Sequence, residues 1–195
     1  MYFLIPLLTV AIWSSNVIVN ILSVNVISPE AISFYRWFIA LIVLTPFLIK
    51  PVWVKRQIIK PYLAKLALLA LLGMVINQSL AYFAAPTTTA THMTLIFSLV
   101  PLLSLTFSVP LLGISLTKRA VLGAMISLTG LVYMLSHGHI STLLSEGINT
   151  GDSYMLIAAC SYSLYGVLLK RWRLPFNNWI ALYMQMVFAV LILLP

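Results

Sequence analysis

Seven long apolar runs, separated by short polar stretches, dominate this sequence. Each is about 17 to 24 residues long, close to the roughly 20 residues that a helix needs to cross the hydrocarbon core of a bilayer. The sequence therefore predicts an all-α, polytopic membrane helix bundle with about seven transmembrane helices. The runs are residues 2–21, 31–49, 66–85, 91–114, 120–136, 153–169 and 179–195.

Charged residues make up 7% of the chain and hydrophobic residues 62%. A soluble domain carries about 25% charged residues, so this chain has too few charges to cover a water-exposed surface. The composition excludes a cytosolic enzyme, a disordered tail and a secreted disulfide scaffold. Cys160 is the single cysteine and has no internal partner for a disulfide.

The first apolar run has two interpretations, a signal peptide or a retained helix. It is longer than the apolar region of a signal peptide, and it lacks both a basic start and a clear small-residue cleavage site. We interpret it as a retained transmembrane helix.

Basic residues occupy every second connection between the apolar runs. The alternate connections carry Glu30, Glu146 and Asp152 but no Lys or Arg. Because basic residues accumulate on the cytoplasmic side of membrane proteins, we expect the N-terminus to be cytoplasmic, in a bacterial cytoplasmic (inner) membrane. The net charge of +8 then reports topology, and no nucleic-acid partner is expected. The basic residues in these connections are Lys50, Lys55, Arg56, Lys60, Lys65, Lys118, Arg119, Lys170, Arg171 and Arg173.

Arg36 is the basic residue that departs from this pattern, because it lies inside the second run near its outer side. A guanidinium at that depth is costly unless it is paired or solvated. One interpretation is that Arg36 extends to the outer interface. The other is that it anchors a helix contact or binds an anionic group of a substrate.

Polar and aromatic side chains inside the apolar runs supply the predicted substrate-binding residues. Amides within the membrane need hydrogen-bond partners that lipid does not offer. They serve either helix packing or the lining of a watery path, and the aromatic rings suit either packing or a pocket for amphipathic solutes. The predicted substrate-binding residues are Trp13, Asn16, Asn77, Gln78, Tyr82, Tyr162 and Tyr165.

Prolines and glycines predict irregular or tightly packed helices. Pro101 and Pro110 are expected to interrupt the fourth run, either as fixed kinks or as hinges, and with Arg36 they form the predicted structural and gating set. Gly123 and Gly130 are seven residues apart and are expected to permit close helix approach.

An offset of 149 residues aligns the first two runs with the last two, with Pro46 matching Pro195 and Arg36 matching Gln185. Five runs separate the copies, so the second would enter the membrane from the opposite side, as in an inverted repeat. The predicted division is a five-helix repeat over residues 1–138, an extracytoplasmic linker over 139–152, and the first two helices of an incomplete second repeat over 153–195.

Short motifs in this order resemble EamA-like transporters of the drug/metabolite transporter superfamily. The first helix carries Trp13-Ser14-Ser15-Asn16, similar to the family's Trp-Gly-x-Asn pattern. Residues 28–40, including Arg36, resemble the second helix, 77–84 the third, and 87–102 the approach to the fourth and its first part. Gly151-Asp152 followed by 158–171 resembles the start of the second repeat. The acidic residue that usually follows the fourth helix is replaced by Ile114.

This resemblance implies ten helices in two inverted halves around a central pathway, and alternating-access transport of small organic solutes such as metabolites, amino acids or drug-like compounds, without ATP. Three of those helices are absent here, which leaves two hypotheses open. The chain is either a secondary transporter of small organic solutes or a non-transporting membrane protein, in the form of a truncated product or of a scaffold that dimerises. Expected partners are membrane lipids, a small organic solute, and either a homodimer partner or the missing helices.

No set of residues for catalysis stands out, so no enzyme activity and no cofactor are expected. His137 and His139 are close enough to share a metal, but a third ligand is not evident, so no metal site is predicted. His92 is interpreted as an interfacial or cavity residue, with a titrating switch as the alternative.

Overall fold

The computed structural model describes residues 4–24, 26–115, 117–135 and 149–194, and within them the chain is helical without strands. The helices are α1 (Leu4–Leu22), α2 (Pro29–Val54), α3 (Arg56–Ile59), η1 (Lys60–Tyr62), α4 (Leu63–Ala70), η2 (Leu71–Ile76), α5 (Asn77–Ala84), α6 (Ala90–Phe97), α7 (Val100–Leu112), α8 (Lys118–Leu135), α10 (Thr150–Trp172) and α11 (Asn178–Ile192).

Among the described residues, four helical stretches are long and apolar enough to cross a membrane: Pro29–Val54, Arg56–Ala84, Ala90–Leu112 and Thr150–Trp172. Pro6–Leu22 and Asn178–Ile192 are shorter apolar helices. All lie where the sequence predicts membrane spans, so the prediction of an all-α, polytopic membrane helix bundle is confirmed.

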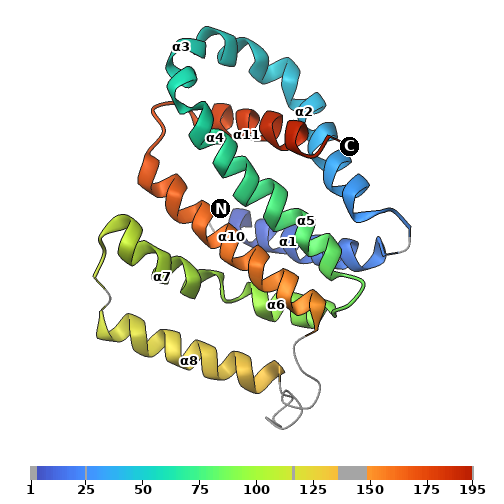
Figure 1. The fold of residues 1–195 in the computed structure, drawn as a ribbon, viewed down its shortest axis with the longest axis vertical. Coiled ribbons are helices and arrows are strands. Elements are labelled where there is room, and N and C mark those ends of the chain that lie inside the picture. The colour runs from blue at the N-terminus through green and yellow to red at the C-terminus, as the bar shows by residue number, and fades with distance from the viewer. Residues whose placement is uncertain (1–3, 25, 116, 136–148, 195) are drawn as a thin grey trace.

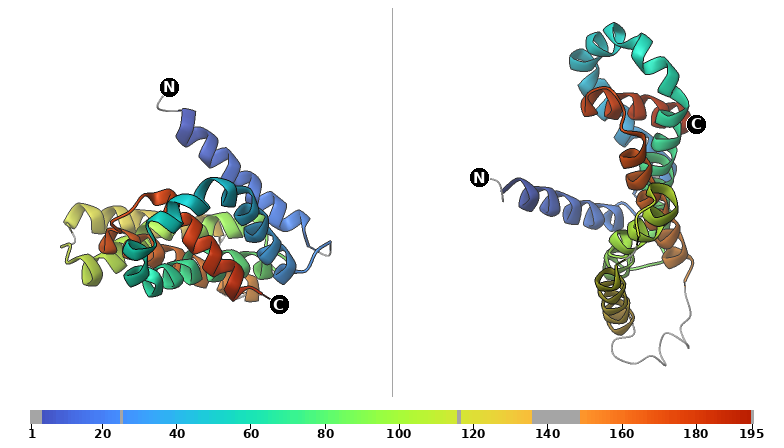
Figure 2. Two further views of the ribbon diagram at one scale, coloured as in Figure 1. Left: turned by 90° about the horizontal axis from the view of Figure 1, so that it is seen from above. Right: turned by 90° about the vertical axis from the view of Figure 1, so that its left-hand side faces the viewer.

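Helix α10 is central to the packing (Figure 1), where it contacts α5, α6, α7 and η2. Helix α11 packs against α2 and α4. Helix α1 differs, because both views of Figure 2 show its N-terminal part projecting away from the other helices. Its apolar side chains are accordingly exposed there, whereas Asn20 near its C-terminal end is buried. Helix α1 therefore joins the bundle through its last turns, next to α5 and α6.

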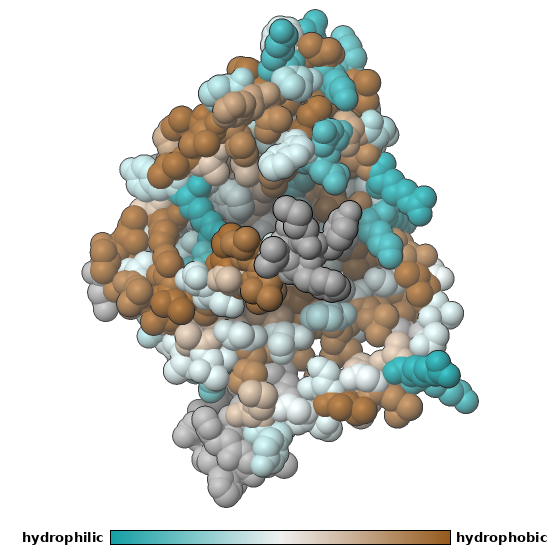
Figure 3. All heavy atoms as spheres, turned by 180° about the vertical axis from the view of Figure 1, so that it is seen from behind, coloured by the Kyte–Doolittle hydropathy of each residue, from teal (hydrophilic) through white to brown (hydrophobic). Residues whose placement is uncertain are grey.

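The connections that carry the basic residues lie on one side of the molecule. In Figure 1 the α2–α3, α7–α8 and α10–α11 connections are at the top and left, and the α1–α2 and α5–α6 connections are at the right. Figure 3, which views the molecule from behind, shows hydrophilic side chains mainly at the top and right edges and apolar ones over much of the remainder. This distribution is the one that a membrane-embedded bundle requires.

Helix α2 is longer than the predicted span, because it begins at Pro29 and continues through Pro46 and Pro51 to Val54. Ser28 caps its start by accepting a hydrogen bond from the Ala31 N–H at 3.3 Å. Each internal proline removes one backbone donor, which a long apolar helix tolerates. The predicted end at residue 49 is therefore wrong.

The predicted third span is not one uniform helix. It consists of α4 and α5 with the π-helical turn η2 between them, and it is preceded by α3 and η1. A π-helical turn has a wider ring than an α-helix, and such turns are frequent at functional sites. The sequence pattern did not reveal this irregularity.

The predicted fourth span is divided into α6 and α7 by a break at Ser98 and Leu99. Pro101 lies in the first turn of α7, where its missing N–H costs least. Pro110 is inside α7, and the helix continues beyond it to Leu112. The fourth span is thus interrupted next to Pro101, while the helix continues through Pro110, and a kink or hinge at either proline stays a prediction.

The expected close packing at Gly123 and Gly130 is also wrong. An added Cβ atom at either glycine would meet nothing within 4 Å, because few neighbours cover α8. Close contacts occur instead at Gly73 and Gly151, where an added Cβ atom would lie 2.7 Å from the Tyr165 ring and 2.6 Å from Thr87 Oγ1, respectively.

Helix α10 starts at Thr150, inside the predicted linker of residues 139–152. Asn149 caps it, because its side-chain oxygen accepts a hydrogen bond from the Asp152 N–H at 2.7 Å. Asp152 therefore belongs to the first helical turn, where a carboxylate is favoured by the helix dipole.

Candidate functional site

The side chain of Arg36 joins three helices. Its Nη1 atom donates to Asn16 Oδ1 at 2.8 Å, Tyr82 OH at 2.9 Å and Gln78 Oε1 at 3.1 Å. Asn16 comes from α1, Arg36 from α2, and Gln78 and Tyr82 from α5. We call these four residues the Arg36 cluster. Three of the predicted substrate-binding residues, Asn16, Gln78 and Tyr82, thus contact the guanidinium of Arg36, which was predicted to have a structural role.

Local helix geometry explains this meeting. Gln78 and Tyr82 are four residues apart and therefore lie on one face of α5, which packs against α2. Tyr82 is 4% exposed, while Arg36, Asn16 and Gln78 are half-buried. The guanidinium carbon also lies 5.6 Å from the centre of the Trp37 ring, within the range of a cation–π contact.

A pocket of about 330 Å³ lies between the α1–α2 connection and the end of α5. Tyr82 belongs both to this pocket and to the Arg36 cluster. Small-molecule sites are concave, mostly apolar and begin at about 300 Å³, so the pocket has room for a small organic molecule. Its lining consists of Ser23, Val24, Val26, Ile27, Ser28, Pro29, Tyr82 and Pro86.

Carbonyl groups of the π-helical turn η2 receive hydrogen bonds from three helices. Ser161 Oγ in α10 donates to the Leu72 carbonyl at 2.7 Å, and Trp37 Nε1 in α2 donates to the Met74 carbonyl at 3.3 Å. Asn77 Nδ2 donates to the Gly73 carbonyl at 3.5 Å. Asn77 is thus directed to the backbone of its own span, separate from the hydrogen bonds of the Arg36 cluster.

Tyr162 and Tyr165 form a stacked pair in α10 with ring centres 5.8 Å apart. Phe97 of α6 lies 5.6 Å from Tyr162. The Tyr165 ring packs directly over Gly73, where a side chain would collide with it. The pair is therefore adjacent to η2, on the side of the bundle formed by α10.

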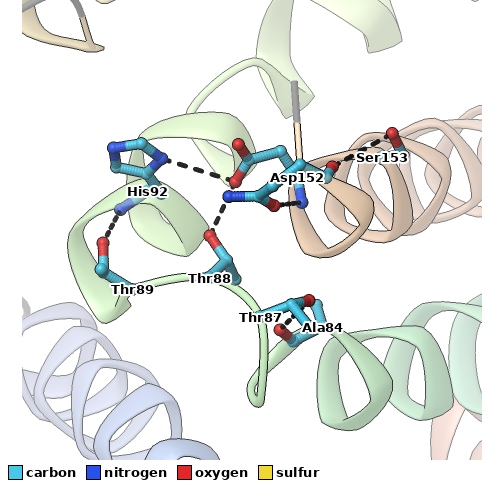
Figure 4. A network of polar contacts seen from close by, with 8 residues as sticks. Ala84, Thr87, Thr88, Thr89, His92, Asp152 and Ser153 are labelled. Carbon is cyan, nitrogen blue, oxygen red and sulfur yellow. Dashed lines mark hydrogen bonds and ion pairs between the residues drawn. The ribbon is translucent and has the colours of Figure 1, made fainter. Parts of the chain in front are cut away.

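A second polar group connects the α5–α6 connection to the start of α10 (Figure 4). Thr88 Oγ1 donates to Asp152 Oδ1 at 2.6 Å, and His92 Nδ1 lies 3.5 Å from the same oxygen. That distance permits an ion pair when the imidazole is protonated. We call Thr88, His92 and Asp152 the outer clamp. Gly151 fits directly beneath it, against Thr87 and the Ala84 carbonyl.

Several predicted residues lie outside these two groups. Pro101 and Pro110 are exposed in α7. Trp13 lies in α1, but its side chain is outside the described part of the chain, as are His137 and His139. In the described residues no three side chains of the metal-binding types gather in one place.

Sequence reasoning missed the outer clamp and the residues that bind η2. Asp152 was expected in a linker and His92 as an interfacial or cavity residue. The Gly151-Asp152 pair was noted as a family-like start of a helix, but it does not indicate a contact with His92. Trp37 and Ser161 carried no such feature, because their partners are backbone carbonyls exposed by an irregular turn.

Comparison with known proteins agrees with this architecture. The model of the EamA-like transporter family matches residues 1–136. A curated relative, "Uncharacterized transporter YyaM" of Bacillus subtilis (strain 168), is 26% identical over 149 residues, which cover 76% of this chain and 49% of that protein. The chain thus spans about half the length of this relative. No solved structure matches.

The helical bundle, the apolar spans and the family match together define an integral membrane protein. The match covers the first five predicted spans, including every residue of the Arg36 cluster. The chain belongs to the EamA-like transporter family.

Proposed function

We propose that this protein moves small organic solutes across the bacterial cytoplasmic membrane by alternating access, without ATP. The observation that carries the proposal is the Arg36 cluster, in which one cationic and three neutral polar side chains from α1, α2 and α5 converge inside an apolar bundle. Polar groups at such depth are costly, and they generally mark a substrate path.

The pocket beside Tyr82 supports this assignment. It lies next to the α1–α2 connection, on the side opposite the basic connections, and it leads to a residue of the Arg36 cluster. With the basic connections in the cytoplasm, this pocket would be the extracytoplasmic entrance, and the N-terminus would be cytoplasmic. Trp13, Asn77, Tyr162 and Tyr165 would line the path further along the bundle.

Irregular backbone near the centre of the bundle supports alternating access. Transporters bind substrate where helices are interrupted near the middle of the membrane. Here η2 interrupts the third span, and a break precedes Pro101 in the fourth. Each is a place where helix segments are able to reorient without unfolding a regular helix.

The proposal further includes an inverted repeat, with residues 1–138 as the first unit and α10 as the start of the second. The family match, which ends at residue 136, supports this division. Gln185, which the 149-residue offset aligns with Arg36, is 2% exposed in α11. A polar side chain at both positions, half-buried at Arg36 and buried at Gln185, agrees with the repeat.

Coupling to an ion is not required by these residues. The acidic side chains are Glu30, Glu146 and Asp152, all near the ends of spans or in connections. A proton carrier is expected to be an acid within the membrane. Facilitated diffusion therefore fits the residues better than proton coupling.

The test is uptake by proteoliposomes that contain the full-length protein, screened with a panel of radiolabelled amino acids, organic acids and amphipathic drugs. We expect saturable uptake of at least one class, and its loss in Asn16→Leu and Gln78→Leu variants. Lys170→Leu, at the exposed end of α10, is the matched control. Absence of uptake across the panel, or uptake unchanged in both variants, would contradict the proposal.

A second candidate function is a non-transporting membrane scaffold that dimerises. The open face of α8 favours it, because a Cβ atom added at Gly123 or Gly130 would meet none of the described residues within 4 Å and Ile126 is 71% exposed. Small residues on a free helix face permit close approach of another helix. Cross-linking through cysteines introduced on this face would detect the dimer, and uptake by the same preparation would exclude the scaffold interpretation.

A further inference from the structure

Arg36 has no acidic partner in the described part of the chain. The acidic side chain that lies close to a basic one there is Asp152, 3.5 Å from His92 Nδ1. The partners of Arg36 are an amide oxygen from each of Asn16 and Gln78 and the Tyr82 hydroxyl. Neutral oxygens solvate a guanidinium but do not cancel its charge. A half-buried positive charge without a counter-charge is therefore built into the bundle.

The hydrogen bonds of Arg36 use only part of its donor capacity. A guanidinium has five N–H donors in a planar fork, and the three bonds all leave from Nη1. The buried side-chain polar atoms without a partner in the described residues are Asn20 Oδ1, Ser79 Oγ and Gln185 Oε1. Nε and Nη2 of Arg36 make no hydrogen bond in the described residues, and neither atom is among these buried, unpartnered atoms. Their N–H groups are therefore accessible.

The edge formed by Nε and Nη2 has the geometry that binds a carboxylate through two parallel hydrogen bonds. The three bonds to Nη1 hold the guanidinium in place from one side, so a ligand on the other edge meets a pre-oriented donor pair. Pre-orientation reduces the conformational entropy that binding costs. The cluster is thus arranged for an anion, with its neutral members acting as supports.

Charge matching selects the kind of anion. Each other Lys or Arg belongs to a connection or a helix end, so Arg36 is the cation of the described membrane interior. One positive charge balances a monocarboxylate, whereas a phosphate group carries about −1.5 to −2 at neutral pH. The nearby pocket of about 330 Å³ adds apolar side chains from Val24, Val26 and Ile27, which suit an organic body.

We infer that the Nε and Nη2 edge of Arg36 is a binding site for the carboxylate of a small organic monoanion that enters through the Tyr82 pocket. This inference rests on the proposed function, because it names the substrate class of the same path. It assigns Asn16, Gln78 and Tyr82 as positioning residues that orient the guanidinium.

Thermal unfolding of the detergent-solubilised full-length protein tests the inference with pentanoate and its neutral amide, pentanamide. The two molecules share shape and apolar body and differ in the carboxylate. At saturation we expect pentanoate to raise the unfolding midpoint by about 2–4 °C and pentanamide to leave it unchanged. Equal shifts by both, or no shift by either, would overturn the inference without any variant being needed. A larger shift by inorganic phosphate would overturn the assignment of a carboxylate.

Variants locate the site. Arg36→Gln should abolish the pentanoate shift, Arg36→Lys should retain a smaller one because a lysine offers charge without the fork, and Lys170→Gln should retain it in full. An unchanged shift in Arg36→Gln would overturn the inference.

The proposal of transport and the proposal of carboxylate binding are separated by measuring how pentanoate and pentanamide inhibit solute uptake into proteoliposomes. Uptake that pentanoate and pentanamide inhibit equally would refute carboxylate binding but leave transport intact. A pentanoate-specific shift that requires Arg36, without uptake of any solute, would refute transport but support the anion site.

Discussion

The Arg36 cluster and the outer clamp are both polar groups that join separate helices, but they treat charge in opposite ways. In the outer clamp the His92 imidazole faces the Asp152 carboxylate, and Asp152 also gains from Thr88 and from the start of α10. In the Arg36 cluster a cation has only neutral partners. In the clamp the carboxylate accepts a hydrogen bond from Thr88 and faces an imidazole, whereas the cluster has a charge and N–H donors without partners.

This difference indicates different roles. The clamp joins the α5–α6 connection and the first turn of α6 to the start of α10, and its carboxylate already has a donor in Thr88. An uncompensated cation within the bundle is stabilised by an anion that binds and dissociates. We expect substitutions in the cluster to affect transport and ligand binding, and substitutions at the clamp to affect stability.

Arg36→Leu should have the largest effect. It removes the charge and leaves the three oxygens of its partners without their donor, and hydrogen bonds to charged groups contribute about 1.5–3 kcal/mol each. We expect initial uptake rates to fall by about tenfold or more, measured in proteoliposomes at matched protein content. Lys170→Leu removes the same charge at an exposed site, and its initial uptake rate should remain close to that of the unaltered protein. Equal effects of both variants would show that the cluster is only structural.

Gly151→Ala should destabilise the protein more than any polar change at the clamp. The new methyl group would lie 2.7 Å from the Ala84 carbonyl oxygen, which is backbone and does not move aside. Such overpacking costs about 1–3 kcal/mol, visible as a lower thermal unfolding midpoint in detergent. Gly166→Ala in the same helix meets nothing within 4 Å and is the control. A Gly151→Ala protein as stable as Gly166→Ala would refute the tight fit of α10 beneath the clamp.

Tyr82→Phe should have an intermediate effect that is confined to function. It removes one of the three acceptors of Arg36 but keeps the ring that lines the pocket. A hydrogen bond to a charged group is worth about 1.5–3 kcal/mol, but the guanidinium keeps its other two acceptors, so we expect uptake to fall by about fivefold. Tyr35→Phe, on an exposed ring of α2, serves as the comparison. An unchanged uptake rate in Tyr82→Phe would mean that orientation of Arg36 does not depend on this hydroxyl.

Asp152→Asn should have the smallest effect. The amide keeps an oxygen that accepts from Thr88 and loses only the attraction to His92, whose side chain is 27% exposed. Pairs this close to solvent contribute about 0–1 kcal/mol and are screened by salt. The lost stabilisation is measured as the change in the thermal unfolding midpoint at low and at high salt. Glu30→Gln, an exposed acid in the first turn of α2, controls for the helix dipole. A transport defect in Asp152→Asn larger than that of Arg36→Leu would reverse the comparison.

Much of the fold was accessible from the sequence because the bilayer restricts the choices. Apolar runs of about 20 residues have few alternatives to helices in a membrane, and the predicted spans correspond to the helices found. The predicted helix boundaries and regularity were wrong where the local backbone departs from a simple α-helix pattern. The continuation of α2 through Pro51 and the wide turn η2 depend on neighbouring helices that a linear pattern does not contain.

The candidate site was only partly accessible from the sequence. Asn16, Gln78 and Tyr82 were identified because polar groups in apolar runs are conspicuous, and Arg36 because it departed from the charge pattern. Asn77, chosen by the same criterion, bonds to the Gly73 carbonyl instead. Adjacent amides in one helix point in directions about 100° apart, so residue type alone did not separate the two roles.

Composition and residue order alone indicate that the chain is a membrane protein, which connections share a side, and that one cation lies inside a span. Those properties follow from composition and order, since hydrophobic length and charge placement act along the chain. The helix packing, in contrast, brings Arg36 to three neutral partners and Asp152 to His92. These contacts join residues 20 to 60 positions apart, which no pattern along the chain places together.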